Sequence, residues 1–410
     1  MYKLPIFLCS LSILTACATH QSRLSPAQRD LLSGNCTLAT KTLSDLSEKS
    51  SDDKLLYLME YGSALQICKD FRTSNKIFLE ADKLSENLDY VSASRVLGAT
   101  LLNEEMLQYK GDIFERLFIN ISLALNYLEL NQPDEAMVEV RRINEKYNKF
   151  ASEEKNSYEL NSFAQYLSGL IFETQNRHDD ACISYKAAYK LDSSYRDVGL
   201  DMLSSCWRAK RLQEFKIMSA EINPSSDELS YIKRKVKNEK IVLFLQGLGP
   251  KKMPRPDNHL YPYLVPSHNL IKKLRLALQF ENGDYNTAES YRVYSVEKAA
   301  IATQEADYKS LAARRLGARI AKEVAADQIR QKDKTLGNIA WLVMVASERA
   351  DLRNWSLLPE SVQVVRVNPM PKTILKVAGI STLDSQVENF PDIDLAADEN
   401  KKIYLIRSIK

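Results

Sequence analysis

The chain has 410 residues, 45% of them hydrophobic, and a formal net charge of +3. This length predicts two or three domains, and the hydrophobic content is sufficient for packed cores, which excludes a disordered chain. Charges of both signs are mixed along the sequence, so it lacks the clustered basic residues that indicate nucleic-acid binding.

The first residues have the pattern of a secretion signal. Lys3 precedes a short apolar run at 4–14, which is too short to span a bilayer, since spanning takes about 20 apolar residues. The run ends in the tetrapeptide LTAC at 14–17, which resembles the lipobox of bacterial lipoproteins. The resemblance implies a signal peptide over 1–16 and acylation of Cys17. The alternative is an ordinary signal peptide with an incidental cysteine.

Cys17 and the residues after it predict where in the cell the protein is located. Acyl chains on Cys17 would anchor a protein body, because each buried CH₂ contributes about 0.8 kcal/mol. The next residue is Ala18 rather than aspartate, and resemblance to enterobacterial sorting then implies the outer membrane. The polar stretch 17–25 predicts a lipidated tether. We therefore expect a lipid-anchored outer-membrane protein that faces the periplasm.

Four cysteines remain beyond the lipobox. They are Cys36, Cys68, Cys182 and Cys206, and an even number in an oxidising compartment indicates disulfides. Cys36 begins one predicted helix and Cys68 ends the next, so antiparallel packing would bring the two together. The same geometry applies to Cys182 and Cys206, and both pairs could meet the Cα separation of about 4.4–6.8 Å that a disulfide needs. The alternative is buried free thiols, which pack as small hydrophobic groups.

One spacing of small and large residues recurs in the first half of the chain. A small residue is followed by a large one, a small one, a large one and a small one at offsets of 3, 9, 4 and 3 positions. This is the tetratricopeptide pattern, in which two antiparallel helices cross closely at the small residues and the pairs stack. The pattern is complete in two segments, at Gly62, Leu65, Ser74, Phe78 and Ala81, and at Gly169, Phe172, Ala181, Tyr185 and Ala188. A further segment, at Ala124, Tyr127, Ala136 and Val140, shows the first four positions.

The repeats are flanked by weaker matches. Residues 26–50 predict a capping helix pair, and 197–224 predict a fourth pair that ends at Pro224. We therefore expect a mainly α fold with a tetratricopeptide-like helical superhelix over 26–225. Another kind of helical solenoid is the alternative.

After residue 239 the sequence predicts a smaller α+β C-terminal domain, 239–410. β-Branched and apolar runs bounded by turn residues indicate strands, and helical spacing indicates two helices over 304–353 that break near Gly337. The expected strands are 240–246, 289–297, 360–367, 373–379 and 401–409.

The most apolar stretch of this domain is Leu336–Ala346, which charged residues flank. We interpret it as a buried helix with Trp341 in the core. The alternative is a segment that dips into a membrane.

Four blocks of the sequence resemble, in the same order, blocks of a family of uncharacterised bacterial lipoproteins with N-terminal tetratricopeptide-like repeats. They lie at 108–142, 161–173, 246–252 and 348–367. The specific parts are "YKGDIFER" in the first block and "ADLRNW" in the last. The resemblance implies a location in the cell envelope and no established catalytic activity.

Within the first block, Tyr109, Lys110, Gly111, Asp112, Glu115 and Arg116 form the sharpest motif. Gly111 predicts a backbone turn, and Glu115 with Arg116 predicts an ion pair that fixes the start of a helix.

The sequence offers little catalytic chemistry. Of four histidines, His20 lies in the tether, and His178 precedes two aspartates that are typical of a helix N-terminus rather than of a metal site. His259 and His268 flank a loop without cysteines or clustered acids, so zinc is not expected. The GLGP at 247–250 lacks the end of a phosphate loop. We expect no catalytic residue, cofactor or metal.

Binding is better supported. Gln66, Asn120, Asn126 and Gln165 lie on the predicted first helices of the repeats, which line the groove of such a superhelix. They are candidate contacts to an extended peptide, or plain surface amides. The sequence therefore predicts a non-catalytic protein-binding scaffold or assembly factor of the envelope. The alternative is a peptidoglycan-binding or peptidoglycan-active protein that uses the C-terminal domain.

Overall fold

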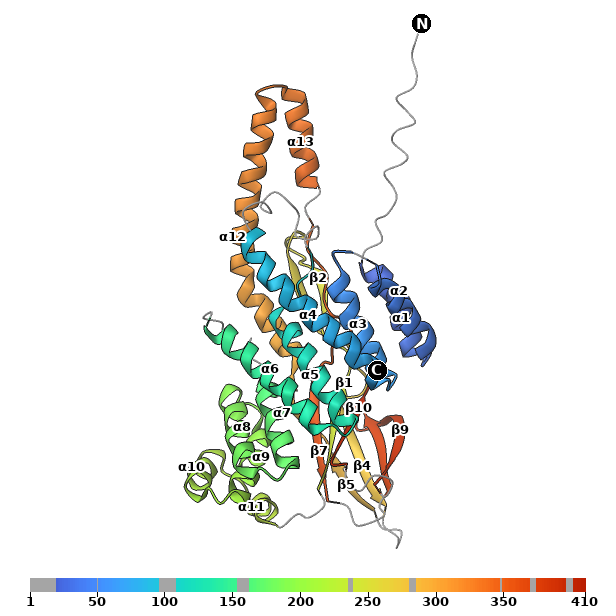
Figure 1. The fold of residues 1–410 in the computed structure, drawn as a ribbon, viewed down its shortest axis with the longest axis vertical. Coiled ribbons are helices and arrows are strands. Elements are labelled where there is room, and N and C mark those ends of the chain that lie inside the picture. The colour runs from blue at the N-terminus through green and yellow to red at the C-terminus, as the bar shows by residue number, and fades with distance from the viewer. Residues whose placement is uncertain are drawn as a thin grey trace.

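The structure is a computed structural model. It describes residues 20–49, 51–95, 108–152, 162–234, 239–279, 285–346, 349–368, 374–395 and 401–410. The predicted signal peptide (1–16) and Cys17 therefore lie outside the described residues. Figure 1 shows a layer of helices against a region of strands, with one long helical hairpin projecting from the body.

The first half of the described chain is helical, and most helices pack against the next one in sequence. Their bounds are α1 (His20–Leu32), α2 (Cys36–Ser47), α3 (Lys54–Ile67), α4 (Phe71–Arg95), α5 (Ile113–Glu129), α6 (Pro133–Ser152), α7 (Ser162–Thr174), α8 (His178–Leu191), α9 (Arg196–Arg208), α10 (Leu212–Ile222) and α11 (Ser226–Lys233).

The small residues of the predicted repeat lie where paired helices cross. A Cβ on Gly62 of α3 would lie 2.7 Å from the ring of Phe78 in α4, and a Cβ on Gly169 of α7 would lie 2.6 Å from the ring of Tyr185 in α8. Since real Cβ atoms do not approach so closely, the large aromatic rings occupy space that only glycine leaves open. The prediction of tetratricopeptide-like helix pairs is confirmed by this packing.

The ends of the helical layer differ from the prediction. Residues 20–25, expected in the tether, form the first turns of α1, because Leu24 is buried together with Ala27 and Leu31. The tether prediction is wrong over these residues. At the other end, α11 continues the helical layer beyond the predicted boundary at residue 225 and packs against α9.

Two four-stranded sheets follow, with a short two-stranded hairpin. The first sheet has the order β10-β1-β7-β6, with β1 and β10 parallel and the other pairs antiparallel. The second sheet is antiparallel with the order β5-β4-β8-β9. The bounds are β1 (Lys240–Gln246), β2 (Lys251–Pro254), β3 (Pro262–Val265), β4 (Lys273–Gln279), β5 (Tyr285–Glu289), β6 (Tyr291–Ser295), β7 (Ser361–Val367), β8 (Ile374–Ile380), β9 (Gln386–Asp394) and β10 (Ile403–Arg407).

The first sheet is the middle of three layers. Side chains of a strand alternate between its two faces. In β1, Leu243 and Leu245 belong to the core shared with the helices, whereas Val242 and Phe244 belong to the core shared with the second sheet. The fully buried strand β1 thus reads as an uninterrupted apolar run, as the sequence predicted. Strands β4, β5 and β9 of the second sheet and the hairpin strands β2 and β3 were not predicted.

The prediction that residues 336–346 form a buried helix is correct about the helix and wrong about its burial. Two helices do form, α12 (Val296–Arg330) and α13 (Lys334–Ala346). However, their outer part projects from the body (Figure 1). Trp341 is only partly buried, and the next two residues, Leu342 and Val343, are at least 60% exposed. We call residues 316–346 the arm. No helix in the described ranges is long and apolar enough to cross a membrane.

Candidate functional site: the repeat face and its C-terminal cover

The first helices of the repeat pairs face the C-terminal domain. Helices α3, α5, α7 and α9 all contact it, through side chains that reach β6, β7, β10 or the segment 349–360. This is the face that the sequence predicted as a groove open to a peptide. In the structure the chain's own C-terminal domain covers it.

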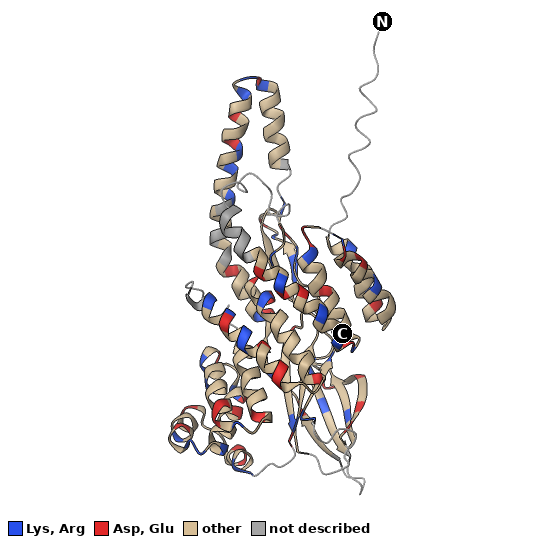
Figure 2. Cartoon of the chain, in the orientation of Figure 1, with Lys and Arg blue, Asp and Glu red and all other residues tan. Residues whose placement is uncertain are grey.

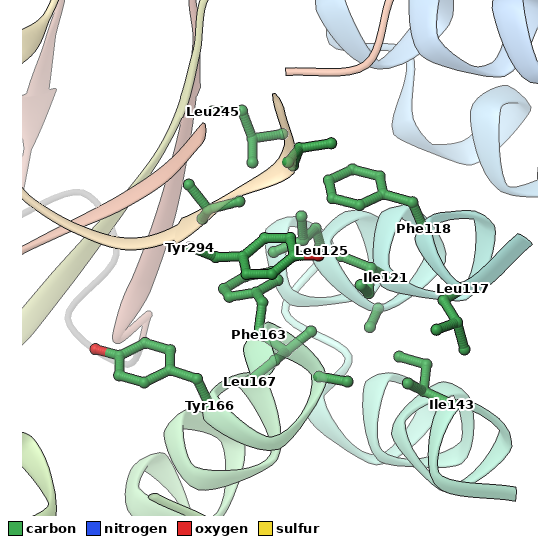
Figure 3. Close-up of a cluster of buried hydrophobic side chains, with 14 of the residues drawn as sticks. Leu117, Phe118, Ile121, Leu125, Ile143, Phe163, Tyr166, Leu167, Leu245 and Tyr294 are labelled. Carbon is green, nitrogen blue, oxygen red and sulfur yellow. The ribbon is translucent and has the colours of Figure 1, made fainter. Parts of the chain in front are cut away.

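Apolar packing forms most of this contact. The ring of Phe163 in α7 stacks at 6.2 Å on the ring of Tyr294 in β6. Figure 3 shows these two rings together, with Leu125 of α5 and Leu245 of β1 in the same cluster. All four side chains are buried, so the helical layer and the first sheet share one continuous core.

Trp355 is the largest side chain that the segment 349–360 inserts between the helices. It is 2% exposed, and its ring lies 5.8 Å from the ring of Phe78 and 6.1 Å from the ring of Phe118. Its indole Nε1–H donates to Ser63 Oγ at 2.9 Å. The ring is therefore enclosed and its polar atom is satisfied, as a buried tryptophan requires.

Glu60 of α3 holds the residues that follow Trp355. Its carboxylate accepts hydrogen bonds from the backbone N–H of Ser356 at 2.6 Å and of Leu357 at 3.2 Å, and from the Ser356 hydroxyl at 2.6 Å. Burial raises the pKa of Glu60 to about 7, although these three donors act in the opposite direction. The Glu60 carboxylate thus accepts the backbone hydrogen bonds that a helix or strand would otherwise satisfy in this irregular segment.

Glu115 of α5 holds Trp355 itself. It accepts from the Trp355 backbone N–H at 2.7 Å, from the Tyr109 hydroxyl at 2.6 Å, and from the backbone N–H of Asp112 at 2.7 Å. The last bond is half of a capping box at the start of α5. Burial, reinforced by the nearby Asp112 carboxylate, raises the pKa of Glu115 to about 7. The predicted turn at Gly111 is confirmed by its φ of +72°.

Arg353 joins three of the sequence blocks that carry the resemblance. Its guanidinium bonds Asp53 at 3.0 Å and Asp351 at 2.7 Å, and lies 5.3 Å from the centre of the Tyr109 ring. Its carbonyl oxygen accepts from Lys252 Nζ at 3.2 Å. Residues from the blocks at 108–142, 246–252 and 348–367 thus meet at one junction.

Arg366 of β7 makes the second buried ionic contact. Its side chain is 7% exposed and contacts Asp201 at 2.8 Å, Glu173 at 2.9 Å and Glu239 at 3.0 Å. Burial would raise the pKa of Glu173, but Arg366 and Arg208 outweigh it and the pKa is lowered. Burial raises the pKa of Asp201 to about 6 despite Arg366.

The carboxylates of this cluster are also bonded by tyrosines. Tyr185 donates to Glu173 at 2.7 Å, and Tyr166 and Tyr291 donate to Asp201 at 2.5 and 2.9 Å. Every carboxylate in the cluster is thus engaged, which is the arrangement that makes a buried charge group tolerable. A cavity of about 360 Å³ opens beside Arg366 and is lined by Asp201, Tyr231, Glu239 and Tyr291, among others.

The four predicted groove amides lie among the helices. Gln66 is buried and donates to Asn126 Oδ1 at 2.7 Å, and Asn126 donates to Ser74 Oγ at 2.8 Å. Asn120 is buried and donates to Glu139 at 2.9 Å, and Gln165, which is half-buried, donates to Asn144 at 2.6 Å. These amides bond neighbouring helices to one another, because a repeat layer must satisfy the polar groups that it buries.

The structure brings the four cysteines together in the predicted pairs. Cys36 and Cys68 form a disulfide with a Cα separation of 5.8 Å, and Cys182 and Cys206 form one with a Cα separation of 4.8 Å. Each joins the start of one helix to the end of a helix packed beside it.

The aspartates after His178 bond arginines. Asp179 contacts Arg211 and Asp180 contacts Arg177. Within the part of the chain that the structure describes, no three histidine, cysteine or acidic side chains are grouped to hold a metal ion.

Sequence reasoning missed the buried contacts of the charges at the centre of this site. Glu60 and Arg366 lie within a predicted helix and a predicted strand, and their spacing does not separate them from surface charges. Glu115 was predicted only as an ion-pair partner of Arg116, and its bond to Trp355 was not foreseen. The signal that could have found Glu60 is its place in an otherwise apolar run of six residues, 55–60, because an acid there falls on a buried face.

No family model and no curated protein matches the chain. Among solved structures, MamA from Desulfovibrio magneticus RS-1 is 14% identical, with 52% of this chain and 96% of that chain covered and a TM-score of 0.34. A putative kinesin light chain from Podosopora anserina with TPR-like repeats is 12% identical, with 52% and 97% covered and a TM-score of 0.35. BtubC from P. vanneervenii is 10% identical, with 53% and 82% covered and a TM-score of 0.36. The packing of the helix pairs, rather than these likenesses, identifies the repeats.

Proposed function

We propose that this protein is a lipid-anchored, non-catalytic scaffold of the bacterial outer membrane that faces the periplasm and binds envelope proteins. The single observation that carries the proposal is the covered repeat face: the helical layer and the C-terminal domain are bonded into one body by buried side chains such as Glu60, Glu115 and Arg366. Such a body suits a rigid platform, because its shape does not depend on a bound peptide.

The titratable groups of the junction support a structural role. Glu60 and Glu115 have the raised pKa values that often mark catalytic acids. However, each accepts bonds from backbone N–H groups of the segment that it holds. A carboxyl engaged in this way has little capacity left for a substrate, so we assign these residues to assembly of the fold.

Partner binding then falls to the outer surface of the superhelix, formed by the second helices of the pairs. Each of these helices leaves a large apolar side chain exposed: Leu38 in α2, Leu79 in α4, Val138 in α6, Ile183 in α8 and Leu212 in α10, at 38 to 60%. Exposed apolar groups of this size are the usual anchors of protein contacts when a partner covers them.

The anchor is tested by metabolic labelling with a fatty acid. The wild-type chain should incorporate label and fractionate with the outer membrane, whereas Cys17→Ser should remain an unlabelled precursor. If Cys17→Ser incorporates label and matures normally, the lipid anchor is wrong.

The scaffold role is tested with a photo-crosslinking residue at Ile183, in intact envelopes. The expected result is a discrete adduct with another envelope protein, while the same residue at buried Phe163 gives none. Binding of the purified protein to isolated cell-wall sacculi without any partner would instead favour a peptidoglycan-binding role and contradict this proposal.

A further inference from the structure

The arm carries eight of the 21 large hydrophobic side chains that are exposed in the described part of the chain. Eight large aliphatic side chains of the arm are 39 to 64% exposed. Soluble monomers rarely leave contiguous apolar patches of more than a few hundred Å² in water, so this surface calls for a cover. The eight are Leu316, Ile320, Val324 and Ile329 of α12, and Leu336, Ile339, Leu342 and Val343 of α13.

The two helices of the arm do not cover these side chains themselves. Where the two helices meet, Ala326 is fully buried, and a Cβ on Gly337 would lie 2.2 Å from the Arg330 side chain. Leu316, Ile320 and Val324 are four positions apart, so they share one stripe of α12. Ala326, which is buried, lies on the opposite side of α12, so the stripe faces away from α13 and is exposed.

The base of the arm is held firmly. Tyr308 of α12 packs edge-on against Tyr261 at 5.4 Å, and the guanidinium of Arg255 lies 4.4 Å from the centre of the Tyr308 ring. Arg315 donates to the carbonyl oxygens of Leu260 and Arg349. The direction of the arm is therefore fixed relative to the body rather than set by a loose hinge.

The arm projects on the side of the molecule where α1 begins, and extends beyond that point (Figure 1). Only residues 18 and 19 separate Cys17 from the start of α1 at His20, and the three steps from residue 17 to residue 20 span at most about 10 Å. If Cys17 carries lipid, as the proposed function holds, the start of α1 lies close to the bilayer. An arm that extends further in that direction then meets the same bilayer.

The charges of the arm complement an anionic surface. Within the arm, 316–346, there are five basic and three acidic residues. Two of the acids, Glu323 and Asp327, contact Arg330, and the third, Asp333, accepts backbone N–H bonds at the start of α13. Figure 2 shows charges along α12 and almost none along α13. Exposed Lys332 and Lys334 lie at the tip.

We propose that the arm binds an anionic membrane surface, with its apolar side chains in the boundary between headgroups and acyl chains and its basic residues at the lipid phosphates. Helices with an apolar face, an aromatic residue and basic residues bind in this way. Helix α13 has 13 residues, too few to span the hydrocarbon core. The inference rests on the proposed lipid anchor for the position of the arm.

The test uses residues 18–410, which contain every described residue but no lipid, in flotation with vesicles of phosphatidylcholine that contain or lack about one third phosphatidylglycerol. We expect flotation with the anionic vesicles. The double variant Ile339→Glu/Leu342→Glu should bind at least about tenfold more weakly, because two apolar groups no longer enter the lipid. The matched control Leu383→Glu, at an 89% exposed residue of the β8–β9 turn, should bind like the wild type.

A second variant, Lys332→Glu/Lys334→Glu, keeps the apolar face and should lose the preference for anionic vesicles. Flotation that neither double variant weakens, or no flotation of the wild type, would overturn the proposal. So would a stable dimer in solution that Ile339→Glu/Leu342→Glu dissociates, since the cover would then be a second copy. Because this chain lacks Cys17, the result is independent of the fatty-acid labelling that tests the anchor.

Discussion

The covered repeat face and the arm are two apolar regions with different surroundings. On the repeat face, Trp355 is 2% exposed and every nearby charge is bonded. On the arm, Trp341 is partly exposed, and neighbouring aliphatic side chains face water. The difference lies in what opposes each surface: a sheet and a buried segment cover the first, and the described chain offers no layer over the second.

This difference teaches that apolar content alone does not mark a core. The sequence of α13 is more apolar than that of most helices in the repeat layer, yet α13 is exposed. Burial at the repeat face coincides with acids and arginines from distant segments that neutralise one another, because a buried surface of this size needs its polar groups satisfied.

The largest effect is expected from Arg366→Leu. This substitution leaves Glu173, Asp201 and Glu239 without their shared partner, and breaking a buried ion pair on one side costs about 3–5 kcal/mol. We expect a loss of about 5 kcal/mol in the free energy of unfolding by urea. The control Arg275→Leu removes contacts to Glu289 and Asp384 on the exposed face of the second sheet, and should leave stability nearly unchanged. Equal effects of the two variants would contradict the buried network.

Comparing the stability of the Trp355→Ala and Trp341→Ala variants tests directly whether the repeat face is buried and the arm is exposed. Removing a large buried aromatic costs about 3–5 kcal/mol, so Trp355→Ala should cost about 4 kcal/mol. Trp341→Ala should cost under about 1 kcal/mol, because the arm leaves that ring partly in water. A larger loss for Trp341→Ala would show that the arm is packed against something in the isolated protein.

The pH dependence of Glu60 sharpens the account of the junction. Its pKa is about 7 in the folded protein and 4.5 as its ordinary value, so its contribution to stability is present below pH 4.5 and is lost as the pH rises through 7. Between pH 5 and 8, the wild type should lose up to about 3 kcal/mol relative to Glu60→Gln. Glu115 and Asp201, whose pKa values burial raises to about 7 and about 6, and His20, whose pKa burial lowers to about 4, titrate in both proteins, so the comparison isolates Glu60. Parallel pH curves would rule out this assignment.

The smallest changes in stability are expected from replacing two glycines with alanine, and the two changes should have opposite signs. Gly62→Ala places a methyl group against the Phe78 ring, so it should destabilise by about 2 kcal/mol. Gly317→Ala, on the arm, meets nothing within 4 Å, and should stabilise by about 0.5–1 kcal/mol through helix propensity. Thermal unfolding measures both, and a stabilising Gly62→Ala would contradict the close crossing.

The sequence predicted local elements well where one periodicity dominates. The crossing of Gly62 with Phe78 and the strands at β1, β7, β8 and β10 follow from spacing and β-branched runs. The sequence could not predict which layer covers which, because Glu60, Trp355 and Arg366 bond partners more than 120 residues away. No local pattern encodes that pairing. The break between α12 and α13 was placed near Gly337, whereas the turn lies at 331–333, because the glycine serves the helix contact instead.

The most direct test of the covered repeat face is amide hydrogen exchange of Trp355, Ser356 and Leu357. These residues lie outside the helices and strands, and their N–H groups donate only to the carboxylates of Glu115 and Glu60 across the junction. The account predicts slow exchange, comparable with the buried strand β1, and fast exchange for the exposed turn at Leu383. Fast exchange of all three amides would show that the C-terminal domain does not cover the repeat face in solution.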